Sequence, residues 1–228
     1  MKKCILFDLD NTILDFTANE KHSLPKTFAH YGEVFTEEIS EIYHRINGNL
    51  WRRYEDKEIT MEELLASRFR DTMAALGKTV DGVAWNETYI QFLSEGHFAM
   101  PGIEVIPKLA DKYRLYIASN GVHSTQENRL KLAGIYDCFE GVFTSGQMGV
   151  QKPNPLFFEK ILEQVPNCDR SHTLMVGDNL KNDIQAAKAV GLQTCMITAY
   201  PGTFEGCDYV IDSLWKLPEL LDSIERKD

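Results

Sequence analysis

The chain has 228 residues, of which 43% are hydrophobic and 25% are charged, and its formal net charge is −10 at pH 7. This length suits one folded domain that carries an insertion, and it is sufficient to bury a sizeable core. The negative charge argues against binding to nucleic-acid polymers and to anionic membranes, because both need a cationic protein face. A local positive site for a phosphate group is not excluded.

The cysteines and the amino terminus indicate a cytoplasmic protein. The five cysteines contain no C-x-x-C pair and are odd in number, so we expect reduced thiols. Only four apolar residues, 4–7, follow the amino-terminal lysines, which is too few for a signal peptide. No apolar stretch approaches the ~20 residues that a bilayer-spanning helix needs. We therefore expect no membrane partner, and the oligomeric state stays open.

A short apolar run, residues 4–7, ends abruptly at Asp8, and a second aspartate, Asp10, follows two positions later. This pattern predicts a buried parallel strand whose carboxylates reach the carboxyl edge of a sheet, where α/β proteins bind ligands. Aspartates at i and i+2 lie on the same side of an extended strand. One carboxylate, held in place by a hard cation, can then attack a substrate. The other carboxylate can donate and accept protons. A solvated strand end is the alternative interpretation.

Residues 16–98 predict a helical insertion between the first strand and the rest of the chain. Apolar residues recur there at helical spacing, and Thr36 and Thr60 are typical N-caps. About four helices fit this stretch, and no strand is indicated. We therefore expect residues 1–15 and 99–228 to form a core domain and residues 16–98 to form a helical cap domain.

Strands and helices alternate in the remainder of the chain. This alternation predicts an α/β fold, a doubly wound parallel sheet with helices on both faces. The expected strands end at Ser119 and span 141–145, 173–177, 194–197 and 209–211, and the expected helices span 104–112, 124–133, 155–164 and 183–190, before a closing helix.

Three later segments place polar residues where they can join the first aspartates. An apolar strand ends at Ser119 and is followed shortly by a glycine. Lys152 lies between a glycine turn and two prolines, and a lysine fixed in this way loses little further entropy on being positioned. Another apolar strand ends in Asp178, with Asp183 five residues further on.

In this order and spacing, the four segments resemble the signature motifs of the haloacid dehalogenase (HAD) superfamily. The resemblance extends from Phe7 to Asp183, and four ordered motifs are highly specific together. It implies a Rossmann-like core and the hydrolysis of a phosphate monoester through an aspartyl-phosphate. Asp8 would be the nucleophile, and Asp10 would protonate the leaving oxygen and then activate water.

The same resemblance implies a metal site. Mg²⁺ would be held by Asp8, by the backbone carbonyl of Asp10 and by Asp178, since this ion prefers oxygen ligands. Asp183 would stabilise the arrangement of these ligands without itself coordinating the ion. The alternative is that Asp183 is only an acidic residue near the start of a helix.

The resemblance further implies a phosphate site. Lys152 would neutralise charge on the nucleophile and on the transferring group. Ser119, with the backbone around Asn120 and Gly121, would donate hydrogen bonds to the phosphoryl oxygens. Thr12 belongs to the same site and would orient the second aspartate, unless it only caps or packs the turn.

Asp10 distinguishes two chemistries within the superfamily. Dehalogenase members generally lack this second aspartate, because a halide leaves without a proton. Asp10, Asn11 and Thr12 resemble the phosphatase version, so a 2-haloacid dehalogenase is the less favoured interpretation. A phospho-receiver module, which regulates rather than catalyses, also combines aspartates with a hydroxyl residue and a lysine. Such modules lack a helical insertion and place the phosphorylated aspartate after the third strand.

Part of the insertion resembles the cap of the bacterial house-cleaning pyrimidine 5′-nucleotidases. Residues 46–54 carry most of this resemblance. Gln126 and Arg129 are also similar to that family, although Gln147 stands where those relatives commonly carry a glutamate. A nucleoside 5′-monophosphate, with pyrimidines preferred, is then the implied small-molecule substrate. Phosphoglycolate or a sugar phosphate is the alternative.

Selection among such substrates would depend on the insertion, because the core motifs contact only the phosphoryl group and the cation. A nucleoside needs an aromatic face for its base and a few polar groups for its edge and sugar. Packing within the cap is the alternative role for each aromatic candidate. The candidates for substrate contact are Asn47, Trp51, Tyr54 and Arg68.

Overall fold

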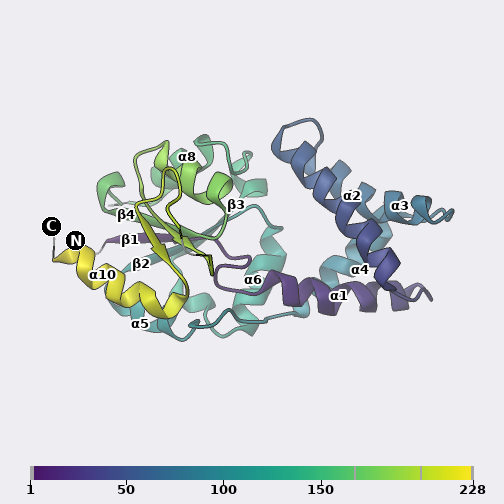
Figure 1. Ribbon diagram of the computed structural model, residues 1–228, viewed down its shortest axis with the longest axis horizontal. Helices are drawn as coiled ribbons and strands as arrows, with labels where there is room; N and C mark the ends of the chain where they lie inside the picture. Colours follow the sequence, from purple (N-terminus) through teal and green to yellow (C-terminus); the bar gives the residue numbers. More distant parts are fainter. Residues whose placement is uncertain (1–2, 167, 201, 227–228) are drawn as a thin grey trace. The chain divides into compact units, whose positions relative to one another are not determined.

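The computed structural model describes residues 3–166, 168–200 and 202–226 and is drawn in Figure 1. The chain divides into two compact units. Met1–Phe16 and His97–Asp228 form the first, called the sheet unit, and Thr17–Gly96 form the second, called the helical unit. The expected insertion, residues 16–98, brackets the helical unit.

The sheet unit is built on a parallel sheet, which has six strands in the described part of the chain. Their spatial order is β3-β2-β1-β4-β5-β6, so the first strand lies inside the sheet and not at an edge. The predicted doubly wound α/β fold is confirmed. The strands are β1 (Cys4–Phe7), β2 (Arg114–Ser119), β3 (Gly141–Thr144), β4 (Thr173–Gly177), β5 (Gln193–Ile197) and β6 (Tyr209–Ile211).

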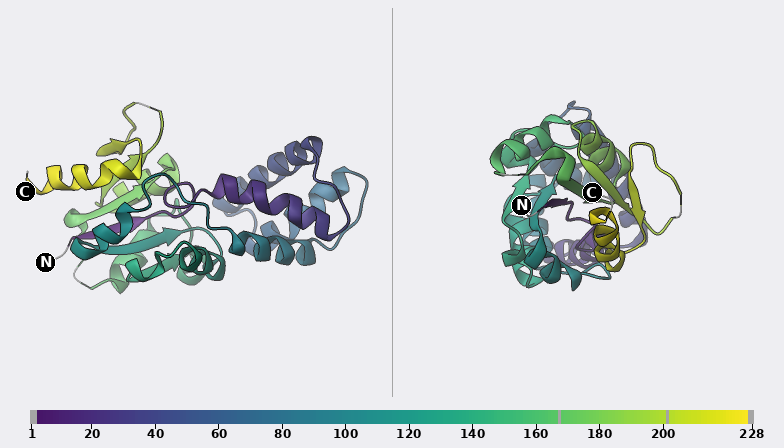
Figure 2. Two further views of the ribbon diagram at one scale, coloured as in Figure 1. Left: turned by 90° about the horizontal axis from the view of Figure 1, so that it is seen from below. Right: turned by 90° about the vertical axis from the view of Figure 1, so that its left-hand side faces the viewer.

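Helices cover both faces of this sheet. They are α5 (Val105–Lys112), α6 (His123–Leu132), α7 (Ser145–Met148), α8 (Leu156–Gln164), α9 (Ala186–Lys188) and α10 (Leu217–Glu225), with short 3₁₀ turns at Tyr136–Cys138, Arg170–His172 and Leu214–Lys216. Successive strand side chains point to opposite faces. Ile5 and Phe7 of β1 therefore pack with α5, α6 and α10, and Cys4 and Leu6 pack with α8 and α9. Figures 1 and 2 show α10 and α5 on one side of the sheet and α8 on the other.

The register of the central strands brings their carboxyl ends to one level. Phe7 in β1 pairs with Ile117 in β2 and with Val176 in β4. Asp8 and Asp178 follow β1 and β4 directly, so both emerge at the same edge of the sheet. Ligands bind at this edge in parallel α/β sheets, and the fold thus places the sequence motifs where chemistry can occur.

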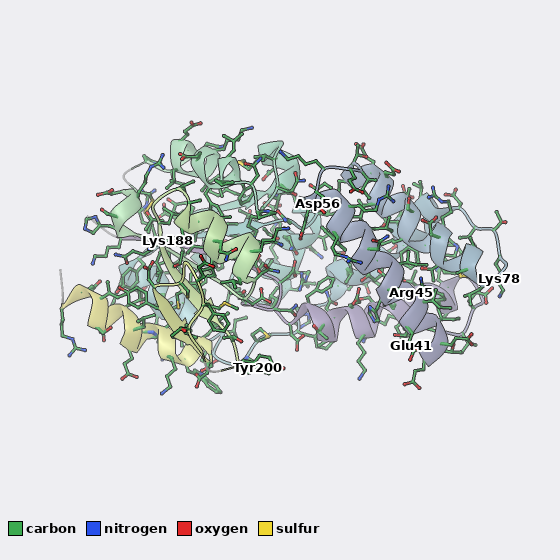
Figure 3. The ribbon with its side chains drawn as sticks, turned by 45° about the horizontal axis from the view of Figure 1, so that its top comes forward. Glu41, Arg45, Asp56, Lys78, Lys188 and Tyr200 are labelled. Carbon is green, nitrogen blue, oxygen red and sulfur yellow. A yellow bond between two sulfur atoms is a disulfide. The ribbon has the colours of Figure 1, made fainter. Side chains whose placement is uncertain are left out.

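The helical unit consists mainly of α1 (Phe16–His30), α2 (Glu37–Glu55), α3 (Met61–Ala75) and α4 (Gly82–Glu95). The two predicted N-caps are confirmed, since the Thr36 hydroxyl accepts from a backbone N–H of α2 at 3.3 Å and the Thr60 hydroxyl accepts from one of α3 at 3.1 Å. Charged side chains such as Glu41, Arg45 and Lys78 are exposed and are labelled in Figure 3. Across the described part of both units, no helix has the length and apolar character needed to cross a bilayer.

Aromatic side chains form the core of the helical unit. Phe28 packs edge-on against Trp85 with ring centroids 5.1 Å apart, and Phe69 lies 5.3 Å from Tyr89 and 5.4 Å from Tyr43. Aromatic pairs favour such tilted and edge-to-face contacts over flat sandwiches. The four helices thus share one apolar interior, as the helical periodicity predicted.

The helix that follows β4 begins earlier than the sequence predicts. The expected helix covers residues 183–190, but Leu180–Gln185 already forms a π-helix, η3, which continues into α9. The Asn179 side chain caps it, because Oδ1 accepts two backbone N–H groups at 3.1 and 2.9 Å. Asp183 consequently lies within the first turn of this helix and not at its first residue. Single π-turns occur often at functional sites.

Cys4 and Cys168 form a disulfide, with Cα atoms 5.7 Å apart. The expectation of five reduced thiols is therefore wrong for this pair, whereas Cys138, Cys195 and Cys207 are free. The two bridged cysteines are 164 residues apart in the sequence, so no local spacing reveals them. They meet because β1 and β4 pair, which brings the start of β1 next to the segment that precedes β4.

Candidate active site

A buried lysine joins two aspartates at the carboxyl edge of the sheet. The Lys152 ammonium donates to Asp8 Oδ1 at 2.8 Å, to Asp183 Oδ1 at 2.5 Å and to the Ala118 carbonyl at 2.7 Å. All three of its N–H donors are thus used. Burial acts to lower the pKa of Lys152, but the charges of Asp183 and Asp8 outweigh burial and raise that pKa above its usual value. The lysine therefore stays charged.

Asp8, Asp178 and Asp183 form an acidic group in which one oxygen of each carboxylate lies within 4.8 Å of the others. Burial raises the pKa of Asp8 well above its usual range; Lys152 opposes this rise and the neighbouring carboxylates add to it. Burial, together with the charge of Asp183, raises the pKa of Asp178 to about 6. Converging carboxylate oxygens that repel one another fit a hard divalent cation such as Mg²⁺.

Asp183 is held at both of its oxygens. Oδ1 accepts from Lys152, and Oδ2 accepts from the backbone N–H of Asn179 at 3.0 Å. The side chain is only 2% exposed. An acid in the first turn of a helix is normally solvated, but Asp183 is buried and paired with Lys152.

The carboxylate of Asp10 is bound by two side chains of α6. Gln126 Nε2 donates to Asp10 Oδ2 at 2.6 Å, and Arg129 Nη1 donates to Asp10 Oδ1. Both donors are almost fully buried. Neither residue has a chemical role that the sequence pattern predicts. The available signal was a pair of polar residues three positions apart, hence on one helix face, directly after the strand that ends at Ser119.

Ser119 is buried beside this pair. Its Oγ accepts from the backbone N–H of Gly121 at 3.0 Å and from Gln126 Nε2 at 2.9 Å. A hydroxyl that accepts two hydrogen bonds keeps its own hydrogen for donation. This arrangement suits a donor to a phosphoryl oxygen.

The side chain of Asn120 serves the loop that carries the lysine. Its Nδ2 donates to the Lys152 carbonyl at 2.9 Å, and its Oδ1 accepts from the Lys152 backbone N–H at 2.9 Å. Two bonds to one peptide unit fix the position of that backbone. The Asn120 side-chain amide therefore places Lys152, and the backbone around Asn120 stays the predicted donor to phosphate.

Thr12 lies in the tight turn that follows Asp10. Asn11 has a positive φ of 61°, which asparagine tolerates better than most residues, and its N–H donates to the Leu14 carbonyl at 2.7 Å. The Thr12 hydroxyl is buried and has no hydrogen-bond partner among the described residues. A buried polar atom without a partner is uncommon, and the role of Thr12 in binding phosphate stays a prediction.

The four candidates in the helical unit lie in different surroundings. Tyr54 belongs to a buried apolar cluster, and Trp51 packs edge-on against it at 5.9 Å. Arg68 is buried, donates through Nε to Asn86 Oδ1 at 2.9 Å and lies over an aromatic ring of α4. Asn47 differs, because its Oδ1 is buried and has no partner among the described residues. Three candidates thus have structural contacts, and Asn47 has an acceptor that no described residue uses.

The chain matches a known protein family over most of its length. A family model described as haloacid dehalogenase-like hydrolase matches residues 2–191. The HAD-hydrolase YfnB of Bacillus subtilis is 36% identical over 194 residues, which cover 85% of this chain and 83% of YfnB. A crystal structure of YfnB bound to magnesium matches with a TM-score of 0.91 over 97% of this chain and 99% of that chain.

Two further relatives are named pyrimidine 5′-nucleotidases. PynA of Streptococcus pneumoniae is 34% identical over 194 residues, covering 84% of this chain and 82% of PynA. YjjG of Escherichia coli is 33% identical over 221 residues, covering 95% of this chain and 96% of YjjG. The resemblance expected from the four motifs is confirmed, and the chain belongs to the haloacid dehalogenase-like hydrolase family.

Proposed function

We propose that this hydrolase is a Mg²⁺-dependent phosphatase that forms an aspartyl-phosphate on Asp8, and that its substrate is a nucleoside 5′-monophosphate with a pyrimidine base. The observation that carries the proposal is the buried contact of Lys152 with Asp8 at 2.8 Å, within the acidic group that also contains Asp178. A carboxylate nucleophile beside a cation and an acid–base group is what phosphoryl transfer through a covalent intermediate needs.

The first step transfers the phosphoryl group to the enzyme. A carboxylate oxygen of Asp8 attacks phosphorus, and the bond between phosphorus and the ester oxygen breaks. The ester oxygen keeps the bonding electron pair and takes a proton from Asp10, so the alcohol leaves neutral. Lys152 offsets the negative charge of the carboxylate nucleophile and of the transferring phosphoryl group. Ser119 donates a hydrogen bond to a phosphoryl oxygen.

The second step returns Asp8 to its starting state. A water molecule attacks the phosphorus of the aspartyl-phosphate and gives a proton to Asp10, which is now a carboxylate. The bond between phosphorus and the Asp8 oxygen breaks, and inorganic phosphate is released. Asp10 thus donates one proton and recovers one, and the cycle closes without any other reactant.

The acidic group is also the proposed metal site. Asp8 and Asp178, with the backbone carbonyl of Asp10, would hold Mg²⁺, and Asp183 would stabilise that arrangement through Lys152 and Asn179. When bound, the ion supplies positive charge that lowers repulsion between the nucleophile and the phosphoryl oxygens. The raised pKa values of Asp8 and Asp178 support this assignment, because these carboxylates lack sufficient compensating charge within the protein.

Two findings support a nucleotide as the substrate. The relatives PynA and YjjG are named for pyrimidine 5′-nucleotides, and each covers most of this chain. In the helical unit, the buried Oδ1 of Asn47 can accept from an N–H group of a base edge. Phosphoglycolate and sugar phosphates present no such N–H donor.

The test is a substrate comparison with and without Mg²⁺. Purified protein is assayed with UMP, dTMP, phosphoglycolate, a hexose phosphate and a 2-haloacid, with phosphate or halide release as the readout. We expect the pyrimidine nucleotides to give the highest kcat/KM and EDTA to abolish turnover. A higher kcat/KM for phosphoglycolate or the hexose phosphate would reject the nucleotidase assignment and leave the phosphatase intact, whereas faster halide release would reject both.

The covalent step needs a separate experiment. Asp8→Asn keeps the shape of the nucleophile but removes its attacking charge, so turnover should fall by several orders of magnitude. Mass spectrometry of acid-quenched wild-type protein should show a phosphoryl group on the peptide that contains Asp8. A folded Asp8→Asn protein with wild-type turnover contradicts the mechanism.

A further inference from the structure

The contacts of Asp10 form a closed hydrogen-bonded ring. Gln126 Nε2 donates to one oxygen of Asp10 at 2.6 Å, and Arg129 Nη1 donates to the other. Arg129 Nη1 also donates to Gln126 Oε1 at 2.8 Å, which joins the two donors. Every link pairs a donor with an acceptor, so the ring fixes the orientation of the glutamine amide as well as that of the carboxylate.

A second contact anchors the ring to the phosphate side of the site. Gln126 Nε2 uses its remaining hydrogen to bond Ser119 Oγ at 2.9 Å. Gly121 makes room for this arrangement, because a Cβ there would lie 2.2 Å from Gln126 Nε2 and 2.7 Å from Gln126 Cδ. The absence of a side chain at Gly121 thus lets the amide reach both Asp10 and Ser119.

The burial of Arg129 is not explained by packing alone. Arg129 is 1% exposed, and its Nε and Nη2 atoms have no hydrogen-bond partner among the described residues. Its guanidinium also lies over the ring of Phe16, 5.9 Å from the centroid. A buried arginine with unpaired N–H groups is unfavourable for stability. The hydrogen bond from Arg129 to Asp10 accounts for the burial of this arginine.

We propose that Gln126 and Arg129 are positioning residues that hold the Asp10 carboxylate in the orientation needed for proton transfer to the leaving oxygen. This inference rests on the proposed phosphatase function. The Asp10 carboxylate can rotate about the Cβ–Cγ bond and would otherwise sample several orientations. Misplacement of a catalytic group by about 1 Å costs roughly 10²-fold in rate. The two donors act on opposite oxygens and so restrict rotation in both directions.

The test compares two aryl esters that differ in their need for a proton. The leaving group of phenyl phosphate is a basic phenolate, which depends on Asp10 for a proton. The leaving group of 4-nitrophenyl phosphate is a weakly basic nitrophenolate, which departs readily without protonation. The readout is the ratio of kcat/KM for the nitrophenyl ester to kcat/KM for the phenyl ester. This quantity reports the steps up to transfer onto Asp8 and does not depend on a nucleotide being the natural substrate.

We expect Arg129→Met and Gln126→Leu to raise this ratio about 10- to 100-fold, because the phenyl ester loses most. Asp10→Asn defines the largest rise available. Gly121→Ala should raise the ratio as well, since it displaces the Gln126 amide without changing its chemistry. Ser124→Ala, at an exposed position of the same helix, should leave the ratio unchanged.

Thermal melting confirms that each variant is folded before the assay. Arg129→Lys replaces Arg129→Met should the latter fail to fold, because lysine keeps the buried cation but loses the planar pair of donors. An unchanged ratio in folded Arg129 and Gln126 variants, with equal losses for both esters, overturns the inference and leaves the phosphatase standing. A wild-type protein that hydrolyses neither ester with Mg²⁺ overturns the phosphatase itself.

Discussion

The carboxylate of Asp183 lies directly against the α-carbon of Gly177. A methyl group added at Gly177 would lie 2.4 Å from Asp183 Oδ2 and 2.5 Å from its Cγ, which is closer than any ordinary contact. Gly177 is the last residue of β4. This position must lack a side chain, because the π-helix brings Asp183 back over it. The end of β4 and the π-helix therefore act together to position Asp183, which pairs with Lys152.

Gly177→Ala should displace Asp183 and weaken the site. We expect a loss of stability of about 1–3 kcal/mol from overpacking and a kcat lowered by at least about tenfold. Denaturant unfolding and steady-state kinetics measure the two effects. Gly146→Ala is the control, because among the described residues no atom outside the local backbone lies within 4 Å of the added methyl group. Equal behaviour of the two variants would show that the contact with Asp183 has no consequence.

Lys152→Met should remove the charge that compensates two buried carboxylates. Breaking a buried ion pair on one side costs about 3–5 kcal/mol, and loss of an electrostatic stabiliser lowers kcat by about 10²–10³-fold. The stability deficit should narrow at pH 5, since burial raises the pKa of Asp8 well above its usual range and a protonated Asp8 no longer needs a cation. Urea unfolding at pH 7.5 and pH 5 tests this.

Lys188→Met supplies the matched control for that lysine. Lys188, labelled in Figure 3, pairs with Asp208 at 2.6 Å, but its side chain is 45% exposed. An exposed pair of this kind contributes about 0–1 kcal/mol. A similar loss of stability in both variants would contradict the special role of the buried lysine.

Mg²⁺ should stabilise the protein far more at pH 7.5 than at pH 5. Burial raises the pKa of Asp178 to about 6 from an ordinary value of 3.8. A carboxyl group with a raised pKa in the folded state stabilises the fold while it is protonated, and this contribution is lost as the pH rises through about 6. The ionised site then gains from a cation, by about 2–3 kcal/mol when the ion is at a hundred times its Kd.

Thermal melts with Mg²⁺ or with EDTA, at matched ionic strength, measure this difference. In Asp178→Asn the pH dependence of the Mg²⁺ effect should be weaker, because one of the groups that must lose a proton is absent. A shift in Tm that is equal at both pH values in the wild type would remove Asp178 from the metal site.

Asn47→Ala should weaken nucleotide binding selectively. Its buried Oδ1 has no partner in the described part of the chain and is the proposed acceptor for a base edge. We therefore expect KM for UMP to rise by roughly tenfold, the value of about one hydrogen bond. KM for phenyl phosphate should stay unchanged, as should both values in the exposed control Asn49→Ala. Arg68 is a poorer probe, because its bond to Asn86 makes its loss destabilising. An equal rise in KM for both esters would contradict base recognition by Asn47.

Local pattern was sufficient for the architecture and for the residues that follow strands. The apolar run before Asp8 predicted β1, and the run before Asp178 predicted β4 with the same bounds as in the structure. A strand ended by a charge is a local signal, since burial of the strand and exposure of its end depend on adjacent residues. The N-caps at Thr36 and Thr60 were predictable for the same reason.

Contacts across the sheet were decided only by the tertiary structure. The disulfide between Cys4 and Cys168 depends on the pairing of β1 with β4, and the early start of the helix that carries Asp183 depends on a cap and on a bare glycine. The ring of Gln126 and Arg129 around Asp10 joins residues more than a hundred positions apart.

The sequence by itself therefore determined which side chains stand at the carboxyl edge, because strand ends are encoded by neighbouring residues. Which of these side chains bind one another was decided by strand order, which places β1 between β2 and β4. Lys152 meets Asp8 and Asp183 only because three separate segments converge there. Hydrogen bonds and ion pairs act over a few ångströms in space, and distance along the chain carries no information about them.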